Sequence, residues 1–102
     1  MKVVAVTACS SGIAHTYMAA EALEVVAKRN GIDISVETQG AMGIENELAP
    51  EDIKEAVCVI LTNDMRIINE HRFEGKKVIR MSTSDVIKKA DIIMKKIIST
   101  FK

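Results

Sequence analysis

A cysteine stands where an apolar segment gives way to small residues, in the stretch VTACSSGIAHT. Cys9 is followed by the candidate loop residues Ser10, Ser11, Gly12, Ile13, Ala14, His15 and Thr16. Small residues let an anion approach the backbone, and hydroxyl groups donate hydrogen bonds to its oxygens. A thiolate that precedes a helix is stabilised by backbone N–H groups and by the helix dipole, which lower the pKa of such a cysteine. The pattern predicts that Cys9 is a nucleophile in a phosphate-binding loop.

Two other interpretations of Cys9 compete with a nucleophile. A cysteine is often a small buried hydrophobe without a chemical role, and we interpret Cys58, inside the apolar run AVCVIL, in this way. A lipid-modified cysteine needs an apolar leader of roughly 7–15 residues behind a charged start. The apolar run of residues 3–8 behind Lys2 is shorter than that, so we expect no lipidation.

The spacing after Cys9 also bears on hydrolysis. Cysteine-dependent phosphatases place an arginine after five intervening residues, and its guanidinium clamps two phosphate oxygens. In this chain His15 stands at the arginine position, and Thr16 follows it. Without the clamp, the equatorial phosphoryl charge is poorly stabilised. The pattern therefore favours transfer of a phosphoryl group, and a low-activity phosphatase that relies on His15 is the alternative.

Strand-like and helix-like patterns alternate along the chain. Apolar, β-branched runs predict strands at residues 3–8, 32–40, 57–62 and 76–81. Helical patterns lie at residues 15–31, after Pro50, and at residues 82–102. The alternation predicts an α/β fold: one doubly wound, Rossmann-like domain over residues 1–102, with four parallel strands in the order 2-1-3-4 and helices on both faces.

Three loops are expected to meet at one edge of that sheet. Ligands of such sheets bind beyond the carboxyl ends of the strands. Besides the Cys9 loop, Gln39 and Gly40 follow the second predicted strand and Asp64 follows the third, so we expect these three residues at the pocket rim. Met18 and Met42 are weighed as exposed partner contacts against an ordinary role in packing.

Composition excludes several classes of protein. The 102 residues carry 14 basic and 14 acidic side chains, and 3% of them are aromatic. A nucleic-acid binder or a polybasic membrane anchor needs an excess of positive charge, and base stacking needs aromatic side chains. The two cysteines have no metal-ligand spacing, which fits a reduced cytoplasmic protein. We expect no nucleic-acid partner, no metal, no cofactor and no segment inserted into a membrane.

Several segments resemble one known family. The matching segments are ACSSGIAHTYMAAEAL, VETQGAMGIEN, EDI and RFEGKKV, which occur in the family's order along essentially the whole chain. They resemble the fructose-type enzyme IIB (EIIB) domain of the bacterial phosphoenolpyruvate-dependent sugar phosphotransferase system (PTS). The usual signature of that domain is Cys-Pro-Thr-Gly-Ile-Ala-His-Thr. Ser10 and Ser11 stand at its Pro and Thr positions, which restores one backbone N–H in the loop.

The resemblance implies a specific activity. It identifies residues 1–102 as a type-2, fructose-like EIIB domain, a protein-phosphohistidine–sugar phosphotransferase. Cys9 would accept a phosphoryl group from a histidine of enzyme IIA and pass it to a sugar, fructose or a fructose-like one, held by the membrane enzyme IIC. The domain would be cytoplasmic and would associate transiently with that permease. A non-catalytic PTS-related module that signals by docking is a further alternative.

Overall fold

The computed structural model describes residues 1–9 and 13–101, which form an α/β fold. In chain order the elements are β1 (Lys2–Ala8), α1 (Ile13–Arg29), β2 (Asp33–Gly40), β3 (Gly43–Glu45), α2 (Pro50–Glu55), β4 (Cys58–Thr62), the 3-10 helix η1 (Glu70–Phe73), β5 (Val78–Met81) and α3 (Thr83–Phe101). Each predicted strand and helix is present, with its ends shifted by a few residues, and β3 was not predicted.

Within the described residues the sheet has five strands in the order β3-β2-β1-β4-β5. Neighbouring strands are parallel except for β2 and β3, which are antiparallel. The predicted wholly parallel sheet of four strands is therefore wrong in its strand count and in its uniform direction. The four predicted strands, now β2, β1, β4 and β5, keep their relative order, and β3 is added at one edge.

Strand β3 escaped prediction because it has three residues and no apolar run. Its partner in the hairpin is the end of β2, and the pair Gly40–Gly43 closes a two-residue turn. Gly43 has a φ of +86°, a conformation that glycine adopts without steric cost. Two glycines around a two-residue turn are a hairpin signal, and they were the available clue to β3.

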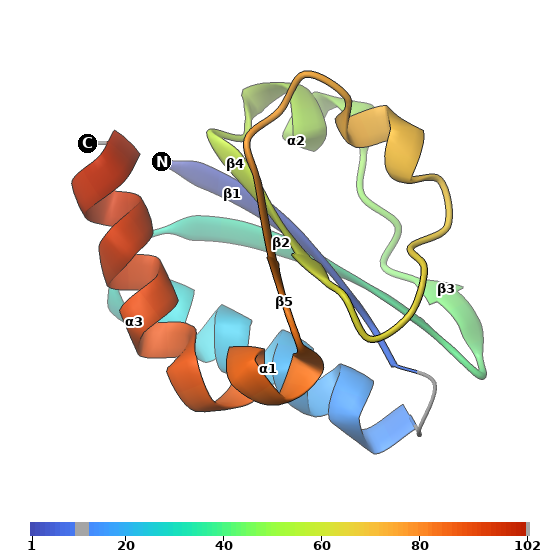
Figure 1. Cartoon of the computed structure of the whole chain (residues 1–102). Helices are drawn as coiled ribbons and strands as arrows, with labels where there is room; N and C mark the ends of the chain where they lie inside the picture. Colours follow the sequence, from blue (N-terminus) through green and yellow to red (C-terminus); the bar gives the residue numbers. More distant parts are fainter. Residues whose placement is uncertain (10–12, 102) are drawn as a thin grey trace.

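Helices cover both faces of the sheet (Figure 1). Helices α1 and α3 pack on one face, where Leu23 and Met94 are fully buried. On the other face α2 and η1 lie over a second core, which includes Ile53 and Phe73. Side chains of β1 alternate between the two cores, as the period of a strand requires.

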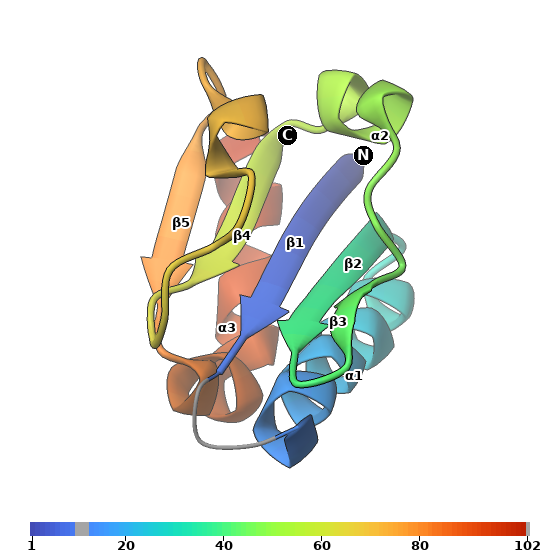
Figure 2. The same cartoon turned by 90° about the vertical axis from the view of Figure 1, so that its right-hand side faces the viewer.

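Parallel strands bring their carboxyl ends to one edge of the sheet (Figure 2). Strands β1, β2, β4 and β5 end there at Ala8, Gly40, Thr62 and Met81. Helices α1 and α3 both begin at this edge, which we call the carboxyl edge. The fold thus brings two helix N-termini and the residue that follows β1 to the same side of the molecule.

Candidate active site

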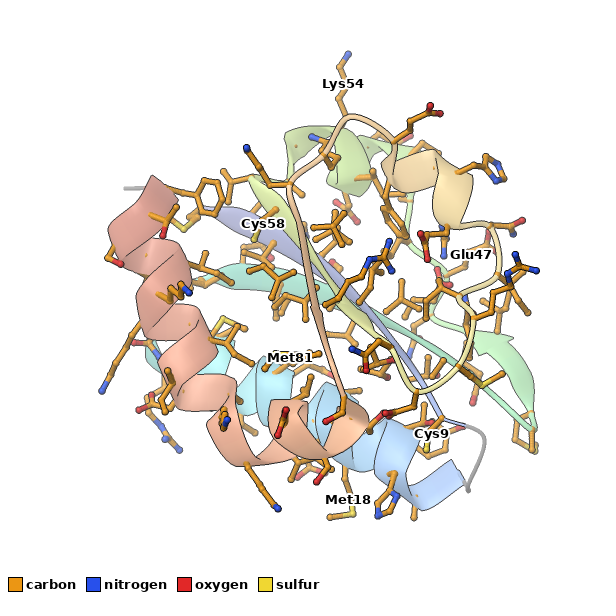
Figure 3. The ribbon with its side chains drawn as sticks, viewed as in Figure 1. Cys9, Met18, Glu47, Lys54, Cys58 and Met81 are labelled. Atoms are coloured by element: carbon orange, nitrogen blue, oxygen red, sulfur yellow. The ribbon has the colours of Figure 1, made fainter. Side chains whose placement is uncertain are left out.

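Cys9 directly follows β1 at the carboxyl edge and is half-buried (Figure 3). Ser10, Ser11 and Gly12, which we predicted as loop residues, lie outside the described residues. Helix α1 begins at Ile13, two residues before the predicted start at His15, so Ile13, Ala14, His15 and Thr16 lie in its first turn. A helix N-terminus therefore follows Cys9 within a few residues.

The end of β1 is held from both sides by threonine hydroxyls. The Thr7 hydroxyl donates a 3.0 Å hydrogen bond to the Thr16 carbonyl in α1. On the β4 side, the Ala8 N–H donates to Thr62 Oγ1 at 2.8 Å, and that hydroxyl donates to the Ala8 carbonyl at 3.0 Å. Each of these hydrogen bonds is buried, so water does not compete for the backbone that leads to Cys9.

The first turn of α1 offers donors rather than charge. Ala14 and His15 are exposed, and none of the described residues in this turn is acidic. The unpaired N–H groups of a helix start and its dipole attract an anion. Thr16 is 2% exposed, and its hydroxyl has no hydrogen-bond partner within the described residues. A buried hydroxyl in that position is costly unless a bound group or water satisfies it.

The three predicted rim residues lie at the carboxyl edge, but two of them, Gln39 and Asp64, use their side chains for hydrogen bonds within the fold. Gln39 is 3% exposed, and its amide bonds the backbone of Ile68 in both directions, donating at 3.1 Å and accepting at 2.8 Å. Asp64 accepts the backbone N–H of Thr83 at 2.7 Å and the Thr83 hydroxyl as well. Gly40 is exposed at the turn into β3. Gln39 and Asp64 therefore anchor the segment after β4 to its neighbours.

A buried ion pair next to Gln39 was not predicted from the sequence. Glu37 is fully buried on β2, and Arg72 of η1 donates to both of its carboxylate oxygens at 2.7 and 2.6 Å. Burial by itself would raise the pKa of Glu37, but hydrogen bonds from Arg72, Gln39 and the Leu48 N–H outweigh it and lower that pKa. The only available signal was an acid within a predicted strand, directly after the apolar residue Val36.

Other polar and apolar side chains are sorted by burial. Burial raises the pKa of the Cys58 thiol to about 11, so this cysteine is an inert member of the core, as predicted. His71 is exposed, in line with the lack of any predicted role. Met18 and Met42 are 51% and 70% exposed, on α1 and on the turn between β2 and β3. Their exposure fits partner contacts better than packing.

The described residues contain no helix with the length and apolar content that a membrane crossing requires.

Comparisons with known proteins agree with one another. The family model for the PTS system, Lactose/Cellobiose specific IIB subunit, matches residues 4–96. The PTS system fructose-like EIIB component 2 of Escherichia coli is 58% identical over 96 residues, which are 94% of this chain and 91% of that protein. The PTS system fructose-specific EIIB'BC component of Vibrio cholerae is 48% identical over 88 residues, 86% of this chain but 15% of that much longer protein.

Solved structures give the same picture. A domain of the fructose-specific IIABC component of the PTS from Borrelia burgdorferi superposes on this chain with a TM-score of 0.87. The two chains are 53% identical, and the superposition covers 93% of this chain and 90% of that one. The overall fold is therefore shared with a chain of closely related sequence.

Proposed function

This chain belongs to the PTS IIB family, the IIB components of the sugar phosphotransferase system, and we propose that Cys9 is its phosphoryl carrier. In the first step the Cys9 thiolate attacks the phosphorus of a phosphohistidine on enzyme IIA. An S–P bond forms as the N–P bond breaks, and the histidine leaves with the electron pair. In the second step a sugar hydroxyl held by enzyme IIC attacks the same phosphorus and loses its proton, and the thiolate is regenerated.

The observation that carries the proposal is the place of Cys9 in the fold. The thiol follows a strand whose last residues are fixed by buried hydrogen bonds. A helix whose first turn holds no acid begins within a few residues of it. A rigid nucleophile beside a helix N-terminus suits phosphoryl transfer, where positioning and charge stabilisation supply most of the rate.

Transfer is favoured over hydrolysis by the partner of Arg72, which is half-buried on η1. Arg72 has both terminal nitrogens on Glu37, so it is not available as a phosphate clamp. His15 is exposed in the first turn of α1, where its imidazole is a weaker partner for a phosphoryl group than a bidentate guanidinium. A phosphoryl group on Cys9 would therefore persist until an acceptor arrives.

The relatives support one of the two proposed partners. A fructose-specific relative joins B and C components in one chain, which supports a membrane enzyme IIC as the acceptor side. We propose a cytoplasmic domain that meets enzyme IIA and the permease in turn, with fructose or a fructose-like sugar as the final acceptor. Met18 and Met42 are exposed apolar side chains at the carboxyl edge, and flexible methionines suit a surface that contacts two different partners.

The decisive experiment is incubation of the protein with phosphorylated enzyme IIA, followed by intact-mass measurement. We expect one phosphoryl group on the native protein and none on Cys9→Ser. The matched control is Cys58→Ala, which removes the core cysteine and should be phosphorylated like the native protein.

Three results would contradict the proposal. Normal phosphorylation of Cys9→Ser would place the group elsewhere. Steady release of phosphate from an aryl phosphate, without a protein acceptor, would favour the phosphatase alternative. Normal binding of enzyme IIA without phosphocysteine would favour a regulatory docking module.

A further inference from the structure

The backbone ladder between β1 and β4 stops before the site. Its register runs from Val3–Cys58 to Val6–Leu61. Beyond it, the side chain of Thr62 takes the place of a backbone partner for Ala8. The Ala8 N–H donates to Thr62 Oγ1 at 2.8 Å, and the same hydroxyl donates to the Ala8 carbonyl at 3.0 Å. One hydroxyl therefore satisfies both backbone polar groups of the residue before Cys9.

Burial makes this dependence strong. Ala8 is fully buried and Thr62 is 1% exposed, so water cannot replace the hydroxyl readily. The Ala8 carbonyl and the Cys9 nitrogen belong to one planar peptide unit. A rotation of that carbonyl turns the Cys9 backbone with it, and the direction of the Cα–Cβ bond changes as well. On the β4 side, Thr62 thus fixes the orientation of the peptide that enters Cys9, while the pairing of Ala8 with Gln39 holds the β2 side.

A second threonine approaches the same carbonyl but has another partner. Thr83 Oγ1 lies 3.4 Å from the Ala8 carbonyl oxygen, and it also bonds a carboxylate oxygen of Asp64 at shorter range. A hydroxyl has one hydrogen to donate, and the charged carboxylate is the stronger acceptor. Thr83 therefore packs against the carbonyl while Asp64 holds the Thr83 proton, and Thr62 is left as the hydroxyl that donates to Ala8.

We propose that Thr62 is a positioning residue for phosphoryl transfer at Cys9, a role that rests on the proposed function. Transfer between nitrogen, sulfur and oxygen needs the attacking and leaving atoms in line, and a displacement of about 1 Å is enough to slow such steps 100-fold. The Thr62 hydroxyl holds the Cys9 backbone in the orientation that in-line attack needs. The described part of the chain offers no second hydroxyl that bonds both groups of Ala8.

The test compares two substitutions that differ in one group. Thr62→Val keeps the shape of the side chain and removes the hydroxyl, whereas Thr62→Ser keeps the hydroxyl. The matched control is Thr38→Val, because Thr38 is also a buried threonine near the carboxyl edge but its hydroxyl has no partner within the described residues. Each protein is mixed with phosphorylated enzyme IIA in single-turnover experiments over a range of donor concentrations, and thermal unfolding checks its fold.

We expect folded Thr62→Val to accept the phosphoryl group about 10- to 100-fold more slowly at saturating donor. The donor concentration at half-maximal rate should stay unchanged, since the docking surface is intact. Thr62→Ser and Thr38→Val should react within about 3-fold of the native rate, a margin small beside the 100-fold cost of misplacement. Native rates for folded Thr62→Val, or a Thr62→Ser as slow as Thr62→Val, would overturn the proposal. Should Thr62→Val not fold, Thr62→Ala replaces it and the serine comparison still decides.

A partner-free measurement separates this proposal from the proposed function. Alkylation of the thiol by iodoacetamide, followed over pH in a Cys58→Ala background, needs no phosphoryl donor. The pH profile of alkylation could be altered by Thr62→Val and restored by Thr62→Ser in a protein that enzyme IIA never phosphorylates. That result would contradict the proposed function but not the positioning role. Phosphorylation of the native protein at Cys9, with neither rate nor profile altered by Thr62→Val, would sink the positioning role alone.

Discussion

Helices α1 and α3 both begin at the carboxyl edge, close to the end of β1, but their first turns carry different chemistry. The described first turn of α1 holds no acid, and its exposed residues are Ala14 and His15. At α3 the Ser82 hydroxyl accepts the N–H of Asp85 at 3.0 Å, while the Asp64 carboxylate accepts the N–H of Thr83. The described residues at the start of α1 therefore bring no negative charge there, whereas side chains already cap the start of α3.

Under the proposed function, the difference would direct a phosphoryl group to one place. Two open helix starts beside one thiol would attract the anion to two positions. Because Asp64 and Asp85 bring negative charge to the start of α3, the proposed site at Cys9 would rely on the start of α1 for its attraction. The segment that carries Asp64 is in turn attached to β2, through Gln39 and through the ion pair of Arg72 with Glu37.

The largest effect is expected from loss of the ion pair between Glu37 and Arg72. Glu37→Gln leaves the Arg72 guanidinium without its charged partner in the protein interior. Breaking a buried pair in this way costs about 3 kcal/mol of unfolding free energy, measured by urea denaturation. The matched control is Glu70→Gln, since Glu70 also binds an arginine, Arg80, through both oxygens but is exposed. The control should cost less than about 1 kcal/mol, and equal losses for the two variants would contradict a special role for burial.

A negative charge placed at the start of α1 should lower activity without lowering stability. Ala14→Asp adds a carboxylate to the exposed first turn of α1. There it interacts favourably with the helix dipole but repels a phosphoryl group. We expect phosphorylation by enzyme IIA to slow about 10-fold, on the order of one like-charge contact near the surface. The thermal midpoint should not fall.

The same charge at the start of α3 is the matched control. Ser84→Asp adds a carboxylate to the exposed first turn of α3, where Asp64 and Asp85 already lie. It should change the rate less than about 2-fold, because repulsion there is already present and is screened. Equal slowing by Ala14→Asp and Ser84→Asp would show that the two helix starts do not differ in the way described.

Removal of the Asp64 carboxylate, which caps the start of α3, should have a smaller effect. Asp64→Ala deprives the Thr83 N–H and hydroxyl of their acceptor at the start of α3. Loss of such a cap costs about 1 kcal/mol of unfolding free energy, which chemical denaturation can measure. Asp64→Asn keeps an acceptor and should cost less than Asp64→Ala. Unchanged stability in both variants would mean that Asp64 does not hold the start of α3.

The smallest effect is a mild acid dependence that begins at Glu37. Its pKa in the folded protein lies below the usual 4.5, so folding is favoured by the charged form above that value. As the pH falls below 4.5, the unfolded chain binds a proton first, and the contribution is lost as the pH falls through the folded pKa. Urea midpoints of the native protein should therefore fall in acid more steeply than those of Glu37→Gln. Parallel curves would contradict this account.

Much of the fold could be predicted because its signals are local. The apolar runs, Pro50 at the start of α2 and the Asn30–Gly31 end of α1 each mark an element by their own residues. Strand β3 was missed, because a three-residue antiparallel strand at an edge has no period of its own to detect. The relative order of the parallel strands followed from the handedness of their connections.

The site was predicted unevenly for the same reason. Cys9 could be placed at a strand end from its neighbours alone, and Cys58 could be assigned to the core from its apolar run. Gln39 and Asp64 were expected at the rim as loop residues, but their side-chain partners, Ile68 and Thr83, are distant in the sequence. No local pattern encodes a hydrogen bond between residues that only the folded sheet brings together.

The amino-acid sequence by itself was enough to predict the α/β class, the relative order of four parallel strands and the family, and to single out Cys9 as the candidate nucleophile, because residue type, periodicity and motif order are properties of the chain alone. Only the tertiary structure decided that Asp64, a residue distant in sequence, caps the start of α3. It also decided that one hydroxyl, that of Thr62, holds both backbone groups of the residue before Cys9. These features depend on register between strands and on contacts over long sequence separations, which packing of the whole chain sets.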